Sequence, residues 1–126
     1  MLTRAALVGF GGFIGSVARY LMAGAVHRVA DRALFPSGTL AVNVLGCLAI
    51  GFLGGLAESR GVLSASARLF LLIGVLGGFT TFSSFGFETM QLLRDGRALA
   101  AAANVSAQVV FGLAAVWGGQ ILARII

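Results

Sequence analysis

The stretch that decides the fold is GVLGGFTTFSSF, residues 74–85, which lies inside an uncharged apolar run from Leu69 to Phe87. Two adjacent glycines weaken a helix, and the four hydroxyl side chains that follow them compete for backbone hydrogen bonds. Within a bilayer, irregular backbone is tolerated only where it is buried in protein or lines a cavity. The alternative is a continuous helix whose hydroxyls bond back to carbonyls one turn earlier. We predict a membrane helix that is broken near Gly77–Thr81, with free carbonyls that suit a monovalent cation.

Three more apolar stretches surround this one, and the composition as a whole is that of a membrane protein. Of the 126 residues, 59% are apolar and 10% are charged, whereas soluble domains average about 45–50% and about 25%. These values exclude a soluble globular domain and a disordered chain, and the single cysteine excludes a disulfide scaffold. A membrane-spanning helix needs about 20 apolar residues. We therefore predict an all-α membrane protein, a single membrane domain over residues 1–126, with four transmembrane helices over residues 5–26, 33–57, 69–93 and 98–123.

The net charge of +5 comes from scattered arginines, which form no basic face of the kind that binds nucleic acid. Four spans place both termini and the second loop on one side of the membrane. That side holds Arg4, Arg60, Arg68 and Arg124, and the other side holds Arg28, Arg32, Arg94 and Arg97. The positive-inside rule therefore gives no preferred orientation. Such a tie arises by chance in a chain with few loop charges, but it also fits dual topology, in which two copies pair as an antiparallel homodimer.

Several polar side chains lie inside the predicted spans, where they are costly and tend to mark a pathway. Arg19 in the first span either extends its head to the interface or has a functional role. Asn43 in the second span can join helices or donate amide N–H groups to an anion. Asn104 and Gln108 lie one turn apart in the fourth span, where they either bond across helices or line a pore. Glu88 closes the third span and is expected at the membrane rim.

Phe82 and Phe85 are three residues apart and share one face of the third span. In most proteins such a pair is part of the core. Aromatic rings nevertheless carry a positive edge. Ring edges, together with hydroxyl and amide donors, can replace the water shell of a small anion.

Three motifs occur in the same order as in the CrcB/Fluc family of fluoride channels, which the chain resembles over its whole length. They are GGFIGSVARY at residues 11–20, GTLAVNVLG at residues 38–46 and GGFTTFSSF at residues 77–85, the last being the most specific. The resemblance implies an antiparallel homodimer with two fluoride pores in the cell inner (plasma) membrane. It also implies a structural sodium ion at the dimer centre, held by the backbone carbonyls of Gly77 and Thr80.

The resemblance further implies roles for individual side chains. Phe82 and Phe85 match the pore phenylalanines of the family, whereas Asn43 matches its pore asparagine and Arg19 its vestibule arginine. The matching pore hydroxyls belong to Thr81, Ser83 and Ser84. In the fourth span the chain departs from some relatives, which carry aromatic or small hydroxyl residues where this chain has Asn104, Gln108 and Gly112. This polar track keeps its polarity but changes its chemistry, which affects the ion path more than fluoride selectivity.

The predicted function is a fluoride-selective channel that exports fluoride passively and relieves its toxicity, with fluoride, a second copy of the chain and membrane lipid as partners. No enzymatic activity is expected, because the one histidine, His27, is expected in a solvated loop and no catalytic motif accompanies it. The alternative is a small dual-topology multidrug-type antiporter, which needs a carboxylate inside the membrane. Here the first span holds Arg19, and all four acids lie at or near span ends. A membrane subunit without transport activity would not explain the hydroxyl and carboxamide side chains inside the spans.

Overall fold

The computed structural model describes residues 1–30 and 35–126, and the regular structure of these residues is entirely helical. Three spans are single helices, namely α1 (Leu2–Val29), α2 (Ser37–Ser59) and α6 (Ala98–Ile125). The third span consists of α3 (Ala65–Arg68), the π-helix η1 (Leu69–Leu76), α4 (Gly77–Phe79) and α5 (Phe82–Arg94). The predicted start of the second span at residue 33 lies outside the described residues.

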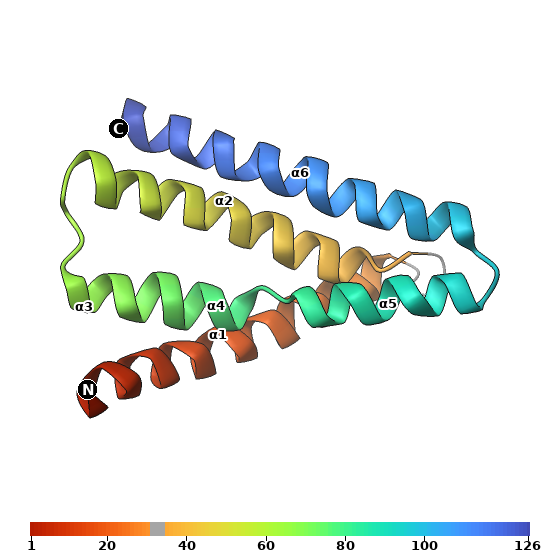
Figure 1. The fold of residues 1–126 in the computed structure, drawn as a ribbon, viewed down its shortest axis with the longest axis horizontal. Helices are drawn as coiled ribbons and strands as arrows, with labels where there is room; N and C mark the ends of the chain where they lie inside the picture. Colours follow the sequence, from red (N-terminus) through yellow and green to blue (C-terminus); the bar gives the residue numbers. More distant parts are fainter. Residues whose placement is uncertain (31–34) are drawn as a thin grey trace.

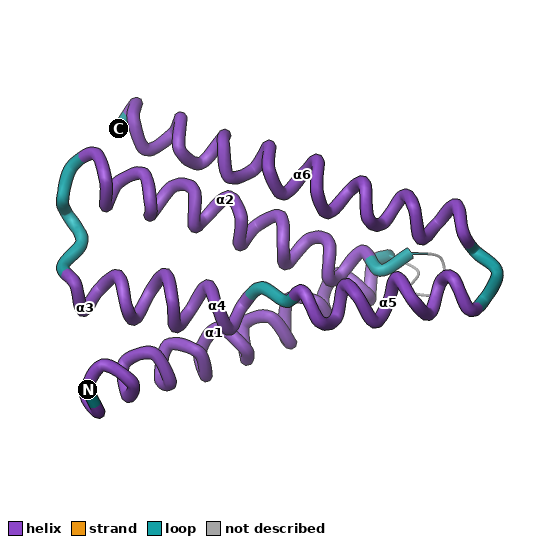
Figure 2. The backbone as a smooth tube through the Cα atoms, in the orientation of Figure 1, coloured by secondary structure: helices purple, strands orange, loops and turns teal. Residues whose placement is uncertain are grey.

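Four spans in the described part of the chain are long and apolar enough to cross a bilayer, with 28, 23, 30 and 28 residues in chain order. The prediction of an all-α protein with four transmembrane helices is therefore confirmed. The chain runs up and down through the spans, so that both termini and the connection from α2 to α3 lie at one end (Figure 1). The turn between α5 and α6 lies at the opposite end. Figure 2 shows that the break in the third span falls well inside the length of the molecule.

Close helix packing depends on glycines that face the backbone of a neighbouring helix. α2 packs along α6, and Gly51 and Gly119 face each other's helix at this contact. α1 packs against η1 and α4, where Gly11 and Gly15 face the backbone of the third span. A side chain at any of these four positions would collide with a backbone carbonyl group. Small residues of this kind let helices approach closely in lipid, and here they fix the third span against α1.

The third span is broken at Thr80 and Thr81, whose backbone is extended (φ −84°, ψ 157° and φ −151°, ψ 116°). The predicted break is confirmed, but it follows the two glycines, which remain helical in α4. The physical reason is that the side chains of the two threonines bond to backbone groups of the flanking helices. The Thr81 hydroxyl accepts from the Ser84 N–H at 3.2 Å and so caps α5. The Thr80 hydroxyl donates to the Leu76 carbonyl at 2.9 Å.

The eight residues of η1 form a π-helix, which the sequence did not predict. Segments of this kind are rare and are found frequently near functional sites. η1 lies against α1 at a very close contact, since a Cβ atom on Gly74 would lie 3.0 Å from the Gly11 Cα. The apolar sequence of residues 69–76 does not differ from that of an ordinary membrane helix, so it carries no local signal for this geometry.

Candidate ion pathway at the broken helix

The break brings two helix ends of opposite polarity together inside the membrane span. α4 ends with carbonyl groups, which carry partial negative charge, and α5 begins with N–H groups, which carry partial positive charge. The Gly78 carbonyl accepts hydrogen bonds from the Ser16 hydroxyl at 3.4 Å and from Arg19 Nε at 3.1 Å. Side chains of α1 therefore cap the negative end of α4.

Arg19 is half-buried and lines a cavity of about 600 Å³ that is formed by α1, α2 and α5. We call this cavity the vestibule. Its other polar wall residues include Arg28, Thr39, Ser84 and Glu88. The sequence left open whether Arg19 extends to the interface or has a role inside the protein. Its hydrogen bond to the end of α4 shows that the side chain is engaged within the protein.

Two residues around the vestibule make contacts that the sequence did not predict. Glu88 lies six residues, about 9 Å, before the end of α5, and its Oε1 accepts a 2.7 Å hydrogen bond from buried Thr39. His27 lies in the last turn of α1 rather than in a solvated loop, and its Nε2 is buried beside Gly38. Sequence reasoning missed Thr39, although its position one turn before Asn43 in an apolar span was an available signal.

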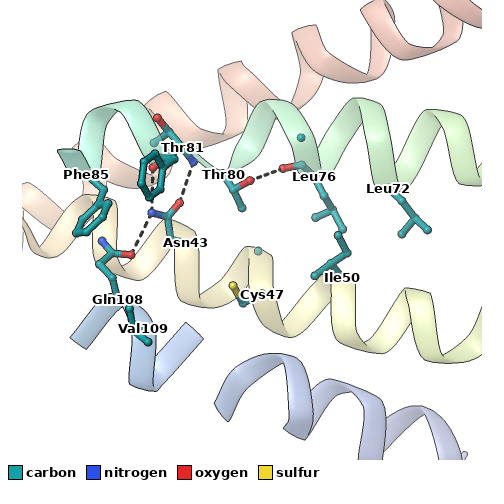
Figure 3. A pocket seen from close by; sticks show the side chains of 13 residues that line it. Asn43, Cys47, Ile50, Leu72, Leu76, Thr80, Thr81, Phe85, Gln108 and Val109 are labelled. Carbon is teal, nitrogen blue, oxygen red and sulfur yellow. Dashed lines mark hydrogen bonds between the residues drawn. The ribbon is translucent and has the colours of Figure 1, made fainter. Parts of the chain in front are cut away.

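Phe82 and Phe85 lie beside a second cavity of about 420 Å³, which we call the phenylalanine cavity (Figure 3). The two rings meet edge to face, with centroids 5.4 Å apart and an interplanar angle of 62°. Phe85 is half-buried, whereas Phe82 is 82% exposed and so offers its ring to a further group. Most of the remaining wall is apolar, and its side-chain amides come from Asn43 and Gln108.

Asn43 of α2 forms hydrogen bonds with the backbone of the third span at the point where its helix is interrupted. Its Oδ1 accepts from the Thr81 N–H at 2.8 Å, and its Nδ2 donates to the Thr81 carbonyl at 3.1 Å. Nδ2 also donates to Gln108 Oε1 at 3.1 Å (Figure 3). An amide nitrogen carries two hydrogens, so both are used within the protein. Asn43 thus lines the cavity, and it satisfies the two backbone groups that the break releases.

The hydroxyl residues predicted after the break form one cluster at the start of α5. Thr81 Oγ1 lies 3.2 Å from Ser83 Oγ and 3.1 Å from Ser84 Oγ. Ser83 is exposed, and Ser84 borders the vestibule. Because a hydroxyl can rotate to donate or accept, this cluster can present O–H groups to an anion beside the positive end of α5.

The two carboxamides of the fourth span have different surroundings. Asn104 is fully buried and lines neither cavity, and its Nδ2 donates to Thr89 Oγ1 at 3.0 Å, which joins α6 to α5. Thr89 in turn donates to the Phe85 carbonyl at 2.8 Å. Gln108 both bonds to Asn43 and lines the phenylalanine cavity. Asn104 therefore bonds across helices, and Gln108 bonds across helices and also lines a cavity.

The carbonyls predicted to hold sodium belong to Gly77 and Thr80, on either side of the end of α4. Gly77 is exposed, and a Cβ atom added to it would meet no heavy atom within 4 Å. Among the described residues, side chains donate to the neighbouring carbonyls of Gly78 and Thr81, but none donates to the carbonyl of Gly77 or Thr80. The same residues contain no group of three or more His, Cys, Asp or Glu side chains suited to a metal ion. A backbone carbonyl site fits a hard monovalent cation better than a transition metal.

A model of the family described as "CrcB-like protein, Camphor Resistance (CrcB)" matches residues 6–120. The chain belongs to the CrcB family. Its curated relatives include the "Fluoride-specific ion channel FluC" of Geobacter sulfurreducens, which is 49% identical over 124 residues, or 98% of each chain. The protein of the same name from Chlorobaculum tepidum is 50% identical over 119 residues, covering 94% of this chain and 93% of the relative. That from Methylobacillus flagellatus is 48% identical over 113 residues, covering 90% and 88%.

Membership in the CrcB family confirms the resemblance inferred from the three motifs, and each motif lies within the matched residues. The relatives are named as ion channels and not as enzymes. The chain is therefore a multi-pass membrane protein of a channel family.

Proposed function

We propose that this CrcB-family chain forms a fluoride-selective channel that exports fluoride passively across the cell inner membrane and relieves fluoride toxicity. The observation that carries this proposal is the arrangement at the break, where an edge-to-face phenylalanine pair lies beside the hydroxyl cluster and the capped N-terminus of α5. The names of relatives at 48–50% identity support the same function.

The physical requirement for such a channel is to replace the water around a small, strongly hydrated anion. Ring edges, hydroxyl groups and amide N–H groups all supply positive charge density without a fixed cation inside the pore. The positive end of α5 adds to this field. In this proposal Arg19 attracts anions into the vestibule, and the pore wall is formed by Asn43, Thr81, Phe82, Ser83, Ser84, Phe85 and Gln108, with Asn104 fixing α6 behind Phe85.

An antiparallel homodimer is part of the proposal. Phe82 is 82% exposed in a single copy, and Gly77 faces open space, so both are available to a partner. The equal number of arginines on the two sides of the membrane fits insertion in both orientations. The remaining outer surface carries exposed apolar side chains such as Phe13 and Trp117, which suit contact with membrane lipid.

A structural sodium ion at the centre of that dimer completes the proposal. The Gly77 and Thr80 carbonyls lie at the end of a broken helix, where membrane proteins use free carbonyls to coordinate monovalent cations. Two copies related by a two-fold axis would together supply four such oxygens. Side chains already occupy the carbonyls of Gly78 and Thr81, which leaves these two groups for the ion.

A small multidrug-type antiporter is the second candidate, and one observation bears on it. Glu88 lies within α5 and borders the vestibule, so the vestibule contains a carboxylate. Proton-coupled export of a cationic drug nevertheless requires a cavity in which negative charge dominates. The vestibule instead contains Arg19 and Arg28 beside Glu88, which favours an anion.

The decisive experiment is ion efflux from liposomes that contain the purified protein. Fluoride efflux should be fast and should follow the electrochemical gradient without a pH gradient, while chloride efflux should equal that of empty liposomes. Transport of a quaternary ammonium dye that depends on a pH gradient, without fluoride efflux, would support the antiporter and overturn the proposed channel.

A further inference from the structure

The amides of Asn43 and Gln108 form a relay whose orientation is determined by one backbone group. The Thr81 N–H can only donate, so the Asn43 atom that it meets at 2.8 Å must be the carbonyl oxygen. The other Asn43 atom is then the nitrogen, which donates to the Thr81 carbonyl and to Gln108. The Gln108 atom that accepts must be its oxygen.

This orientation determines where the nitrogen of Gln108 points. Nε2 is buried and has no hydrogen-bond partner among the described residues. Figure 3 shows it on the side of Phe85, while Oε1 points to Asn43. A buried nitrogen with two unused N–H groups beside an aromatic pair is an arrangement that favours an acceptor or an anion.

We infer that Gln108 is a positioning residue for the break, and that it supplies the side-chain amide donor that faces the phenylalanine cavity. Its oxygen accepts from Asn43 and so secures that side chain in the orientation that the Thr81 N–H selects. Asn43 in turn holds both backbone groups of Thr81 and thereby fixes the start of α5. The nitrogen of Gln108 is turned toward the ring pair by the contact with Asn43. The second half of this inference rests on the proposed fluoride channel, whereas the first half does not.

The inference assigns two contacts to one side chain of the fourth span. Gln108 accepts from Asn43 through its oxygen, and the same side chain lines the phenylalanine cavity. The relay also links α2, the break and α6, so that side chains of two other helices hold the backbone N–H and C=O of Thr81.

Two substitutions at Gln108 separate its two tasks. Gln108→Glu keeps an oxygen that can accept from Asn43 but replaces the NH₂ group with a second carboxylate oxygen. The relay should therefore persist, whereas the donor is lost and the added negative charge also repels an anion. Gln108→Met keeps the length and removes both functions. Gln120→Met is the matched control, because Gln120 is exposed in the same helix and lines neither cavity.

Each variant is measured by hydrogen exchange of the Thr81 amide by NMR in lipid nanodiscs and by fluoride efflux from liposomes. Gln108→Met should accelerate Thr81 exchange at least tenfold, because Asn43 loses the contact that secures it. Gln108→Glu should leave Thr81 exchange within about threefold of the unmodified chain, yet slow fluoride efflux roughly 10- to 100-fold through the lost donor and the added negative charge. Gln120→Met should change neither quantity. If Gln108→Met does not assemble, Gln108→Ser removes the same contact with a smaller polar side chain.

The outcomes separate this inference from the proposed function. Unchanged Thr81 exchange in both Gln108→Met and Gln108→Ser would overturn the positioning role. Unchanged fluoride efflux in Gln108→Glu would overturn the donor role. If the unmodified chain does not transport fluoride while Thr81 exchange responds as expected, the proposed channel function fails and the positioning role is supported.

Discussion

Replacing Gly15 by alanine tests whether the close approach of α1 determines the geometry of the break. A Cβ atom at this position would lie 2.8 Å from the Phe79 amide nitrogen and 2.9 Å from the Val75 carbonyl carbon, whereas ordinary contacts begin near 3.4 Å. The obstacle is backbone, which cannot rotate away as a flexible side chain can. α1 must therefore withdraw by more than half an ångström from the last turn before the break.

The cost of this withdrawal follows from the contacts that α1 makes one turn further on. Ser16 and Arg19 reach the Gly78 carbonyl at 3.4 and 3.1 Å, so the same shift takes both beyond good hydrogen-bond distance. Overpacking costs about 1–3 kcal/mol. A lost hydrogen bond adds about 0.5–1.5 kcal/mol, or more where one partner is charged. Gly15→Ala should therefore destabilise the folded chain by about 2–5 kcal/mol.

The assay is thermal unfolding in detergent, followed by fluoride efflux for the variant that remains folded. Gly9→Ala is the matched control, because it lies on the same helix and its added carbon meets no atom within 4 Å. It should leave the midpoint of unfolding unchanged or raise it slightly, since alanine favours a helix more than glycine does. Equal midpoints and equal efflux in Gly9→Ala and Gly15→Ala would refute the view that α1 holds the break in place.

Three further predictions follow from the proposed channel. Phe82→Ile and Phe85→Ile should each slow fluoride efflux roughly 10- to 100-fold without preventing assembly, whereas Phe87→Ile, an exposed phenylalanine of α5 outside both cavities, should have no effect. In a Cys47→Ala background, Asp95→Cys in the turn after α5 should react with impermeant reagents from both sides of the membrane, and labelling from one side only would exclude dual topology. Replacing sodium with a large organic cation by prolonged dialysis should reduce transport or dissociate the dimer, so full transport under these conditions would argue against the carbonyl site.

The break and its location within Gly77–Thr81 could be predicted from the sequence, but the residues within this range that leave the helix could not. Two glycines and four hydroxyls within one apolar run weaken a helix by local chemistry alone. The location at Thr80 and Thr81 depends on Asn43, which belongs to α2 and is 38 residues away in the chain. Local helix propensity shows which segment of the third span forms a helix poorly. The hydrogen bonds from Asn43 then determine that the backbone of Thr81 is the part that is not helical.

The polar residues of the spans could also be identified from the sequence, whereas their hydrogen-bond partners could not. Apolar length identified the four spans, and polarity at membrane depth singled out Arg19, Asn43 and Gln108, for each of which the sequence left two roles open. The sequence did not identify the partners, because nothing in it distinguishes the backbone groups of Gly78 and Thr81 from those of other residues. Asn104 appeared to belong to the same polar stripe as Gln108, but a small difference in helix rotation buries one and leaves the other beside a cavity.

A broken helix offers an anion path only if its negative end is neutralised near the path. The positive N-terminus of α5 attracts an anion with a charge of roughly half a unit, and the C-terminus of α4 opposes it with about the same magnitude. In this chain the Gly78 carbonyl is bonded by Ser16 and Arg19, and the Thr81 carbonyl by Asn43. Each of these bonds covers a repulsive oxygen with a donor, close to the N–H and O–H groups of the first turn of α5. In the proposed channel Arg19 therefore has two roles: its charge attracts the anion into the vestibule, and its Nε occupies a carbonyl oxygen that would otherwise repel the anion.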